Sequence, residues 1–254
     1  MRGFVDRLGV TSLRIAAVET PHRYGDPDAA LADVDRALAA LSGRVDLALL
    51  PECALTGYVS PEGDFDLSRF AEPIDGPSAR RVASIAKSHG LSVVCSLVER
   101  EGAARFNTLA LFGPDGELAA RWRKRHPWYP ERWATPGDLG TPVVEHRGVR
   151  LTACVCFDIH FIGDDAPEAL READVMLFAS AWVEDGPGDS RAEILPALAR
   201  RFSVPIVNAN WGRGDPLVRG QGKSRVVAAS GVETFARRSA GATFAVAEID
   251  RRSA

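Results

Sequence analysis

The apolar positions along the chain predict strands and helices in alternation. The stretch LRIAAVE at 13–19 is almost wholly apolar, as expected for a buried strand. It is followed at 26–41 by DPDAALADVDRALAAL, whose apolar residues recur at helical spacing behind an aspartate and an early proline, the usual features of a helix start. The run VDLALLPE at 45–52 returns to the strand pattern. The chain is therefore predicted to open with a strand, a helix and a second strand.

The same two patterns continue to the end of the chain, with no internal repeat and no low-complexity linker. The turn residues GPDG at 113–116 separate two predicted strands and predict a hairpin, so the sheet cannot be purely parallel. We therefore expect one α/β domain over residues 1–254, with mixed sheets covered by helices. Further strands are predicted at 91–99, 107–113, 118–124, 149–156, 174–180, 204–210, 224–229 and 242–250, and further helices at 78–89, 167–172 and 191–202.

Composition and charge narrow the class of partner. The 254 residues are 46% hydrophobic, which is enough to bury a sizeable core. The formal net charge is -3 and the pI is near 6.0, with Lys and Arg scattered along the chain. A nucleic-acid-binding protein would be expected to carry a basic patch. A small, near-neutral substrate fits better.

The spacing of the cysteines and the length of the apolar runs indicate in which cellular compartment the protein is expected. Cys53, Cys95, Cys154 and Cys156 have neither the C-x-x-C spacing of a zinc or redox site nor the density of a secreted disulfide scaffold. The N-terminal stretch lacks the pattern of a secretory leader, and no run of about 18 apolar residues occurs. We expect a cytoplasmic protein with reduced thiols that neither crosses nor binds a membrane.

Polar residues just past apolar strands are the first candidates for chemistry, because reactive groups of α/β folds collect where strands end. Glu52 ends one apolar run, where a carboxylate is either functional or a loop cap paired with an arginine. Lys124 ends another, in a segment that also holds Glu131, although a lone lysine is normally solvated. Cys156 is the last residue of a third run. Cys154 sits deeper, where a free cysteine is usually a small buried hydrophobe.

Together these segments resemble the nitrilase superfamily of carbon-nitrogen hydrolases, whose signature is a Glu, a Lys and a Cys in that order. The matching motifs are PECALTGY for the glutamate, WRKRHPW with a following PGD for the lysine, and VCFDIHF for the cysteine. Later segments look like further landmarks of the family, in the same order: ADVMLFASAW, ALARRFSVPIVNANW, GQGKSRVVAASG and FAVAEID. The resemblance therefore extends over most of the chain.

The resemblance implies both a fold and a set of site residues. The fold is a four-layer α-β-β-α sandwich, usually paired into dimers, so we expect a homodimer or a higher homo-oligomer. Glu52, Lys124 and Cys156 correspond to the catalytic triad, and Glu131 to a second carboxylate near the lysine. Cys154 has no counterpart and is expected in the core.

The chemistry of these residue types agrees with amide hydrolysis. An amide is a poor electrophile, and a covalent thioester on Cys156 divides its hydrolysis into two easier steps. A free thiol and a free glutamate differ by about four pKa units, roughly 6 kcal/mol against direct proton transfer. We therefore expect burial to raise the pKa of Glu52, and the Lys124 ammonium to favour the thiolate. Lys124 and the backbone N–H of Phe157 are the expected oxyanion donors. No step requires a metal or an organic cofactor.

A Cys–His dyad is the rival mechanism. His160 lies four residues after Cys156, but neither cysteine has the sequence context of a papain-like or caspase-like protease. The histidines also lack the spacing of zinc ligands.

Substrate specificity is only partly predictable. Many relatives that act on carboxylate-bearing amides have an arginine where this chain has His160, and their FPE becomes FIGDDAPE, an apparent insertion. Trp128, Tyr129 and Trp182 are candidates for lining a small pocket, or else they pack in the core. Acidic residues also gather near the expected pocket and predict a preference for neutral or amine-bearing amides. They are Asp164, Asp165, Glu184 and Asp185.

The sequence thus predicts an amidase that converts a small linear amide to a carboxylic acid and ammonia. Hydrolysis of an N-carbamoyl amine and N-acyl transfer use the same three residues and remain open. A non-enzymatic binding protein would leave the triad unused.

Overall fold

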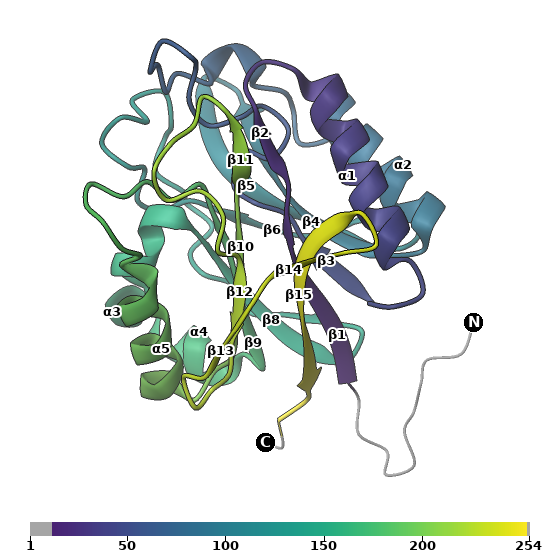
Figure 1. Ribbon diagram of the computed structural model, residues 1–254, viewed down its shortest axis with the longest axis vertical. Coiled ribbons are helices and arrows are strands. Elements are labelled where there is room, and N and C mark those ends of the chain that lie inside the picture. The colour runs from purple at the N-terminus through teal and green to yellow at the C-terminus, as the bar shows by residue number, and fades with distance from the viewer. Residues whose placement is uncertain (1–11, 253–254) are drawn as a thin grey trace.

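The computed structural model describes residues 12–252, so the first part of the N-terminal stretch considered above lies outside the described chain. Two sheets face each other in the middle of the molecule, with helices on each outer side (Figure 1). This is the four-layer α-β-β-α sandwich expected from the resemblance.

Within the described chain, the first sheet has seven strands in the order β14-β15-β1-β3-β4-β5-β6. β1, β3 and β4 are parallel, and the other pairs are antiparallel. The predicted hairpin is confirmed, because β5 and β6 are antiparallel and the N–H of Gly116 donates to the carbonyl of Gly113 at 2.9 Å. The strands are β1 (Ser12–Glu19), β3 (Leu47–Leu49), β4 (Ser92–Glu101), β5 (Ala104–Phe112), β6 (Leu118–Arg123), β14 (Arg237–Ser239) and β15 (Ala242–Asp250).

The second sheet has six strands in the described chain, in the order β13-β12-β10-β9-β8-β7, with β8, β9 and β10 parallel. Its strands are β7 (Val144–His146), β8 (Val149–Val155), β9 (Val175–Ser180), β10 (Ile206–Asn210), β12 (Arg225–Val227) and β13 (Glu233–Phe235). A small parallel pair joins β2 (Pro21–Arg23) to β11 (Gly212–Asp215). The sequence did not predict β2, β7, β11, β13 and β14, because three or four partly exposed residues carry little periodicity.

Helices cover both outer faces. α1 (Pro27–Leu41) and α2 (Pro77–His89) lie on the first sheet, and α3 (Ile162–Asp165), α4 (Pro167–Glu172) and α5 (Arg191–Phe202) lie on the second (Figure 1). The start of α1 is the predicted one: Asp26 accepts the N–H of Ala29 at 3.0 Å, and Pro27 occupies the first turn. α2 ends at Gly90, whose φ of 63° suits a residue without a side chain. Two short 3-10 turns complete the described chain, η1 (Ser68–Phe70) and η2 (Cys156–His160).

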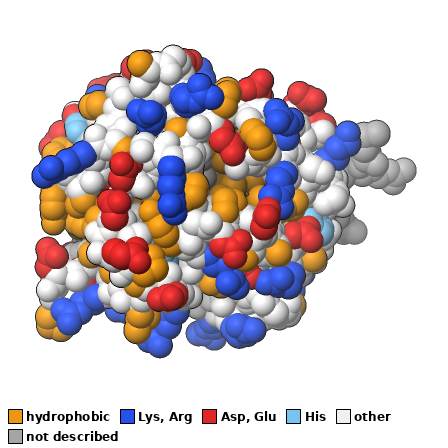
Figure 2. Space-filling model, turned by 90° about the horizontal axis from the view of Figure 1, so that it is seen from above, with side chains coloured by type: hydrophobic (Ala, Val, Ile, Leu, Met, Phe, Trp, Pro, Cys, Tyr) orange, Lys and Arg blue, Asp and Glu red, His pale blue; other side chains and the backbone are white. Residues whose placement is uncertain are grey.

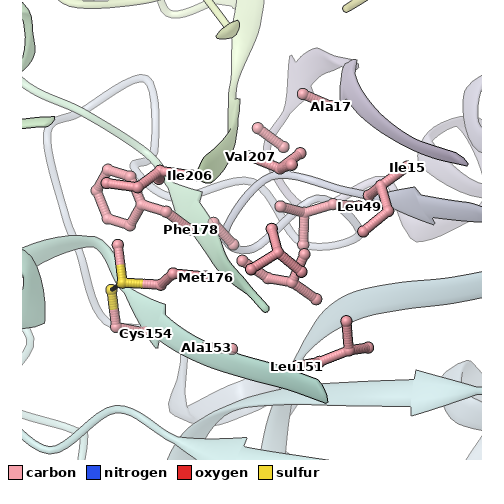
Figure 3. Packing of buried hydrophobic residues seen from close by; sticks show 14 of the residues in the cluster. Ile15, Ala17, Leu49, Leu151, Ala153, Cys154, Met176, Phe178, Ile206 and Val207 are labelled. Carbon is pink, nitrogen blue, oxygen red and sulfur yellow. Dashed lines mark hydrogen bonds between the residues drawn. The ribbon is translucent and has the colours of Figure 1, made fainter. Parts of the chain in front are cut away.

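The core follows from the alternation of side chains along β1. Ile15 and Ala17 point between the sheets, whereas Ala16 and Val18 point toward α1 and α2. Figure 3 shows both faces of the second sheet: Leu151 and Val207 lie toward Ile15 and Leu49 of the first sheet, whereas Cys154 packs on the opposite face with its sulfur 4.0 Å from that of Met176. Each large side chain buried in this way contributes about 1.5–3 kcal/mol. Cys154 is therefore a core residue, as predicted.

The surface carries charges of both signs. On the face drawn in Figure 2, basic and acidic side chains are interspersed, which agrees with the scattered Lys and Arg of the sequence. None of the helices in residues 12–252 is long and apolar enough to cross a membrane.

Candidate active site

Three strand ends bring the predicted site residues together. Glu52 lies in the turn after β3, and Lys124 is the first residue after β6. Both strands belong to the seven-stranded sheet. Cys156 follows β8 of the facing sheet and starts η2. The three side chains therefore meet only because the two sheets pack face to face.

The backbone turns sharply at Cys156. Its φ of 45° lies in the left-handed region, which a cysteine occupies at a cost of about 1–3 kcal/mol. A strand, a strained turn and a helical turn in succession are the geometry that presents a nucleophile at a strand end. The turn is held by the buried carboxylate of Asp158, which accepts the N–H groups of Val155 at 3.3 Å and of Arg125 and His126 at 3.1 and 2.8 Å. Asp158 thus connects the nucleophile turn to the segment that follows Lys124.

A buried charge cluster lies beside this turn. The ammonium of Lys124 is 2.8 Å from Glu52 Oε1 and 2.8 Å from Glu131 Oε2, and each of the three residues is at most 2% exposed. Asn107 donates through Nδ2 to Glu52 Oε1 at 2.7 Å, and the N–H of Ala181 donates to Glu52 Oε2 at 2.9 Å. One cation therefore serves two carboxylates, and Glu52 is fixed by donors from both sheets.

The pKa shifts follow from burial and from the neighbouring charges. Burial raises the pKa of Glu52, and the ammonium of Lys124 opposes this only in part. Burial lowers the pKa of Lys124, but Glu131 and Glu52 outweigh it, so the net shift is upward and the lysine stays charged. Burial and the charge of Glu52 raise the pKa of Cys156 well above its ordinary value.

The effect of Lys124 on the thiol has the expected sign. Lys124 favours the thiolate of Cys156, but burial is the larger effect and the net shift of the thiol pKa is upward. A hydrogen bond with the Cys156 thiol acts to lower the pKa of Glu52. A hydrogen bond from the N–H of Ala181 acts to lower the pKa of Cys156. His160 instead packs against Trp182, with ring centroids 5.7 Å apart, so the Cys–His dyad is not the arrangement in the structure.

Cys156 lines a cavity of about 360 Å³, which is large enough for a small organic molecule. The cavity walls contain Trp128, Phe157, His160 and Trp182 of the predicted pocket. Among the described residues, a larger hollow of about 440 Å³ beside β2 and β14 contains no thiol. The cavity at Cys156 therefore joins a thiol to a space that can hold a small ligand.

Tyr129 does not reach this cavity. It is 77% exposed and contacts Trp128 edge-on at 4.7 Å. Trp128 turns inward and stacks on Tyr58, so its neighbour in this irregular loop faces the solvent. The expectation that Tyr129 lines the pocket is therefore not met.

Of the four acidic residues expected near the pocket, two line the cavity and two do not. Glu184 and Asp185 line the cavity, whereas Asp164 pairs with Arg201 at 3.0 Å and Asp165 with His126 at 2.6 Å. The apparent insertion after the nucleophile forms the single turn α3, to which Asp164 and Asp165 belong.

Several site residues were missed. Tyr58 and Asp158 lie inside the quoted motifs PECALTGY and VCFDIHF, next to residues that were singled out. Asn107 is a polar residue buried in the apolar strand β5, a signal that the sequence did offer. The N–H of Ala181 is a backbone group, and no side-chain pattern announces it.

The whole described chain agrees with a single family. The profile of the carbon-nitrogen hydrolase family matches residues 14–254. The chain belongs to this family. This carbon-nitrogen hydrolase is 29% identical over 216 residues to an (R)-stereoselective amidase of a Pseudomonas species, covering 84% of this chain and 77% of that one. It is 34% identical over 153 residues to a formamidase of Nitratidesulfovibrio vulgaris, covering 56% of this chain and 43% of the formamidase.

Comparison with solved structures agrees with this family assignment. A double mutant of the amidase from Nesterenkonia sp. AN1, in complex with acrylamide, superimposes with a TM-score of 0.77 at 27% identity and covers 98% of this chain and 94% of its own. Another mutant of that amidase carries acrylamide added to its active-site cysteine, with a TM-score of 0.74, 28% identity and coverage of 92% of both chains. This carbon-nitrogen hydrolase is thus an amidase-like enzyme of the nitrilase superfamily, acting on C–N bonds.

Proposed function

We propose that this carbon-nitrogen hydrolase hydrolyses a small linear amide to a carboxylic acid and ammonia through a thioester on Cys156. The observation that carries the proposal is the buried Glu52–Lys124–Glu131 cluster directly beside a thiol that lines a cavity. Structural ion pairs are also buried in proteins, but they are not usually placed against a strained cysteine at a cavity wall.

The first half of the reaction forms the thioester. The Cys156 sulfur attacks the amide carbon while its proton passes to the Glu52 carboxylate, whose raised pKa makes it a stronger base than a free glutamate. Lys124 and the N–H of Phe157, which lies in the first turn of η2, stabilise the oxyanion. Protonated Glu52 then gives its proton to the amide nitrogen, the C–N bond breaks and ammonia leaves.

The second half releases the acid. Glu52 takes a proton from a water molecule, and the resulting hydroxide attacks the thioester carbon. The C–S bond breaks, the acid is released and the proton returns to the Cys156 sulfur. Glu131 keeps Lys124 charged and oriented through both halves. These steps use side chains and backbone groups of this chain together with one water molecule.

Ammonia release across a panel of amides, nitriles and N-carbamoyl amines tests this proposal. Turnover of amides, with a mass increase on Cys156 equal to the acyl group, is the expected result. Faster turnover of carbamoyl amines would reassign the substrate class. Turnover that depends on an added amine acceptor would indicate acyl transfer.

We also propose that the enzyme is a cytoplasmic homodimer. Closed two-fold pairing is the commonest solution for homo-oligomers, and the resemblance to the nitrilase superfamily supports it. Light scattering at micromolar concentration should give twice the mass of the 27.3 kDa chain. A monomeric mass would contradict this proposal.

A further inference from the structure

We propose that the cavity at Cys156 selects amides whose acyl chain ends in a protonated amine, with Glu184 and Asp185 as the counter-charge. This inference rests on the amidase function proposed above and adds the substrate class. It follows from the charges, the fixed geometry and the aromatic walls of the cavity.

The cavity lining is acidic. Glu184 and Asp185 are its charged side chains, and the described lining residues include no Lys or Arg. His160 does not supply a fixed positive charge, because burial lowers its pKa below the ordinary value of 6.5. Lys124 is not among the lining residues, and its charge is already offset by Glu52 and Glu131.

Two arginines close to the cavity donate to groups other than its two carboxylates, although Arg191 also lies 5.8 Å from the ring centroid of Trp182. Arg191 is buried and binds Asp189 at 2.9 Å, Asn208 at 3.3 Å and the carbonyls of Gly220 and Gly222. Arg219 donates to the backbone carbonyl of Asp185 at 3.4 Å, so its contact leaves the Asp185 carboxylate free of a described partner. A ligand ammonium would therefore meet carboxylates that are not yet neutralised by a direct ion pair.

Glu184 is held in position in advance. Its Oε1 accepts three hydrogen bonds, from Trp182 Nε1 at 2.7 Å, from the N–H of Ser190 at 2.8 Å and from Ser190 Oγ at 2.9 Å. Every hydrogen bond to this carboxylate within residues 12–252 ends on Oε1, which leaves Oε2 for a ligand. Because the side chain is already ordered, binding an ammonium costs little further conformational entropy.

The walls suit an alkyl chain that carries a cation. Trp128, Phe157 and Trp182 present aromatic surface to the cavity, which attracts both methylene groups and an ammonium. Tyr58 lines the same cavity, is 1% exposed, and its hydroxyl has no hydrogen-bond partner among the described residues. A buried polar atom normally finds a partner, so this hydroxyl marks a position where a ligand polar group completes the site.

A matched series of amides tests the inference through activity. 5-Aminopentanamide, hexanamide and the monoamide of glutaric acid differ mainly in the charge at the end of the chain. We expect kcat/KM for the aminoamide to exceed that for hexanamide by about tenfold, and that for the glutaric acid monoamide by about 10² or more, from the Coulomb energy of a partly buried pair. Raising the ionic strength should reduce both ratios only slightly, since the cavity is partly shielded from salt.

Variants connect the preference to the two carboxylates. Glu184→Gln keeps an acceptor for Trp182 and Ser190 but removes the charge, and Asp185→Asn removes the second charge. The aminoamide to hexanamide ratio should fall in each variant and approach one in the double variant. Asp164→Asn is the matched control, because this residue pairs with Arg201 away from the cavity, and it should keep the wild-type ratio.

A binding measurement separates this inference from the proposed function. Cys156→Ala protein, titrated calorimetrically with pentylamine and with 1-pentanol, should bind the amine at least about tenfold more tightly. Amine binding without turnover of any amide would sustain the acidic cavity and refute the amidase. Turnover of amides with no preference for the amine, in either assay, would refute this inference alone, as would a preference for the glutaric acid monoamide.

Discussion

Two neighbouring residues of the chain, Arg123 and Lys124, each place a buried cation between carboxylates. Arg123 is 2% exposed, binds Glu99 through Nε at 3.0 Å and Nη2 at 2.6 Å, and lies 3.8 Å from the ring centroid of Phe106. Lys124 is 1% exposed and shares its ammonium between Glu52 and Glu131. By burial and by pairing, the two clusters look alike.

The carboxylates distinguish them. Burial alone would raise the pKa of Glu99, but hydrogen bonds from Arg123 and Thr108 outweigh it, and the net shift is downward. Glu52 is shifted upward, because burial is opposed by one ammonium whose charge Glu131 also uses. Glu99 also contacts Arg121 at 2.6 Å, so two guanidinium groups bind it, although both also contact the more exposed Glu101. A carboxylate that accepts hydrogen bonds from two guanidinium groups is a fixed structural ion, whereas a fully buried carboxylate that shares one ammonium with a second carboxylate can exchange a proton.

The largest expected effect comes from removing the sulfur beside the Lys124 cluster. Cys156→Ala should lower kcat by at least about 10⁴ and abolish the acyl adduct, as loss of a covalent nucleophile does. Cys154→Ser is the control: it should stay active and lose about 1–3 kcal/mol of unfolding free energy, because a hydroxyl replaces an apolar thiol in the core. Steady-state kinetics and mass spectrometry measure both, and the opposite pattern would assign the nucleophile to Cys154.

The next effect contrasts the two glutamates directly. Glu52→Gln should lower kcat by at least about 10², since the proton acceptor is lost while the side-chain shape is kept. Glu99→Gln should leave kcat of the folded protein nearly unchanged and lower its stability, because Arg121 and Arg123 lose their partner charge. Kinetics at saturating amide, together with urea unfolding, distinguish these outcomes. An equal loss of kcat in both variants would remove the distinction between the clusters.

A smaller effect concerns stability alone. Arg123→Met should lower the free energy of unfolding by about 3 kcal/mol, since it breaks a fully buried pair. Arg121→Met, at a side chain that is 30% exposed and contacts the same Glu99, should cost at most about 1 kcal/mol. Comparable losses in the two variants would mean that burial does not set the strength of this cluster.

The smallest effect is a difference in pH dependence. Glu52 must be ionised to act as a base, and its pKa is raised, so kcat/KM should decline on acidification at a pH above the ordinary value of 4.5. Glu99 has a lowered folded pKa, so its contribution to stability is complete above 4.5 and is lost as the pH falls through that lower value. The stability gap between wild type and Glu99→Gln should therefore shrink only below 4.5. An activity limb below 4.5 would rule out Glu52 as the base.

The sequence predicted the long elements and also the short, wholly buried strands β3 and β12. β1, β4, β5, β15 and α1 were all located, because their apolar runs span seven or more residues. The edge strands β7, β13 and β14 have three residues each and are partly exposed, so neither hydrophobicity nor alternation could reveal them. Such strands are determined by pairing with distant segments of the chain, which the local sequence does not reveal.

The site residues that the sequence could predict are polar residues at the ends of strands. Glu52, Lys124 and Cys156 are polar residues just past apolar runs, and the structure brings their side chains together. Trp128 and Tyr129 could not be told apart, because an irregular loop has no period that indicates which side faces inward. Asn107 lies inside a strand, where a polar residue is read as part of the sheet.

The site's division between two sheets has a consequence for folding. The contact from Glu52 to Lys124 spans 72 residues of chain, and the contact from Glu52 to the N–H of Ala181 spans 129. Such non-local contacts form late, because closing long loops costs entropy before any contact repays it. In a refolding experiment, we therefore expect activity to return only after the two sheets have docked.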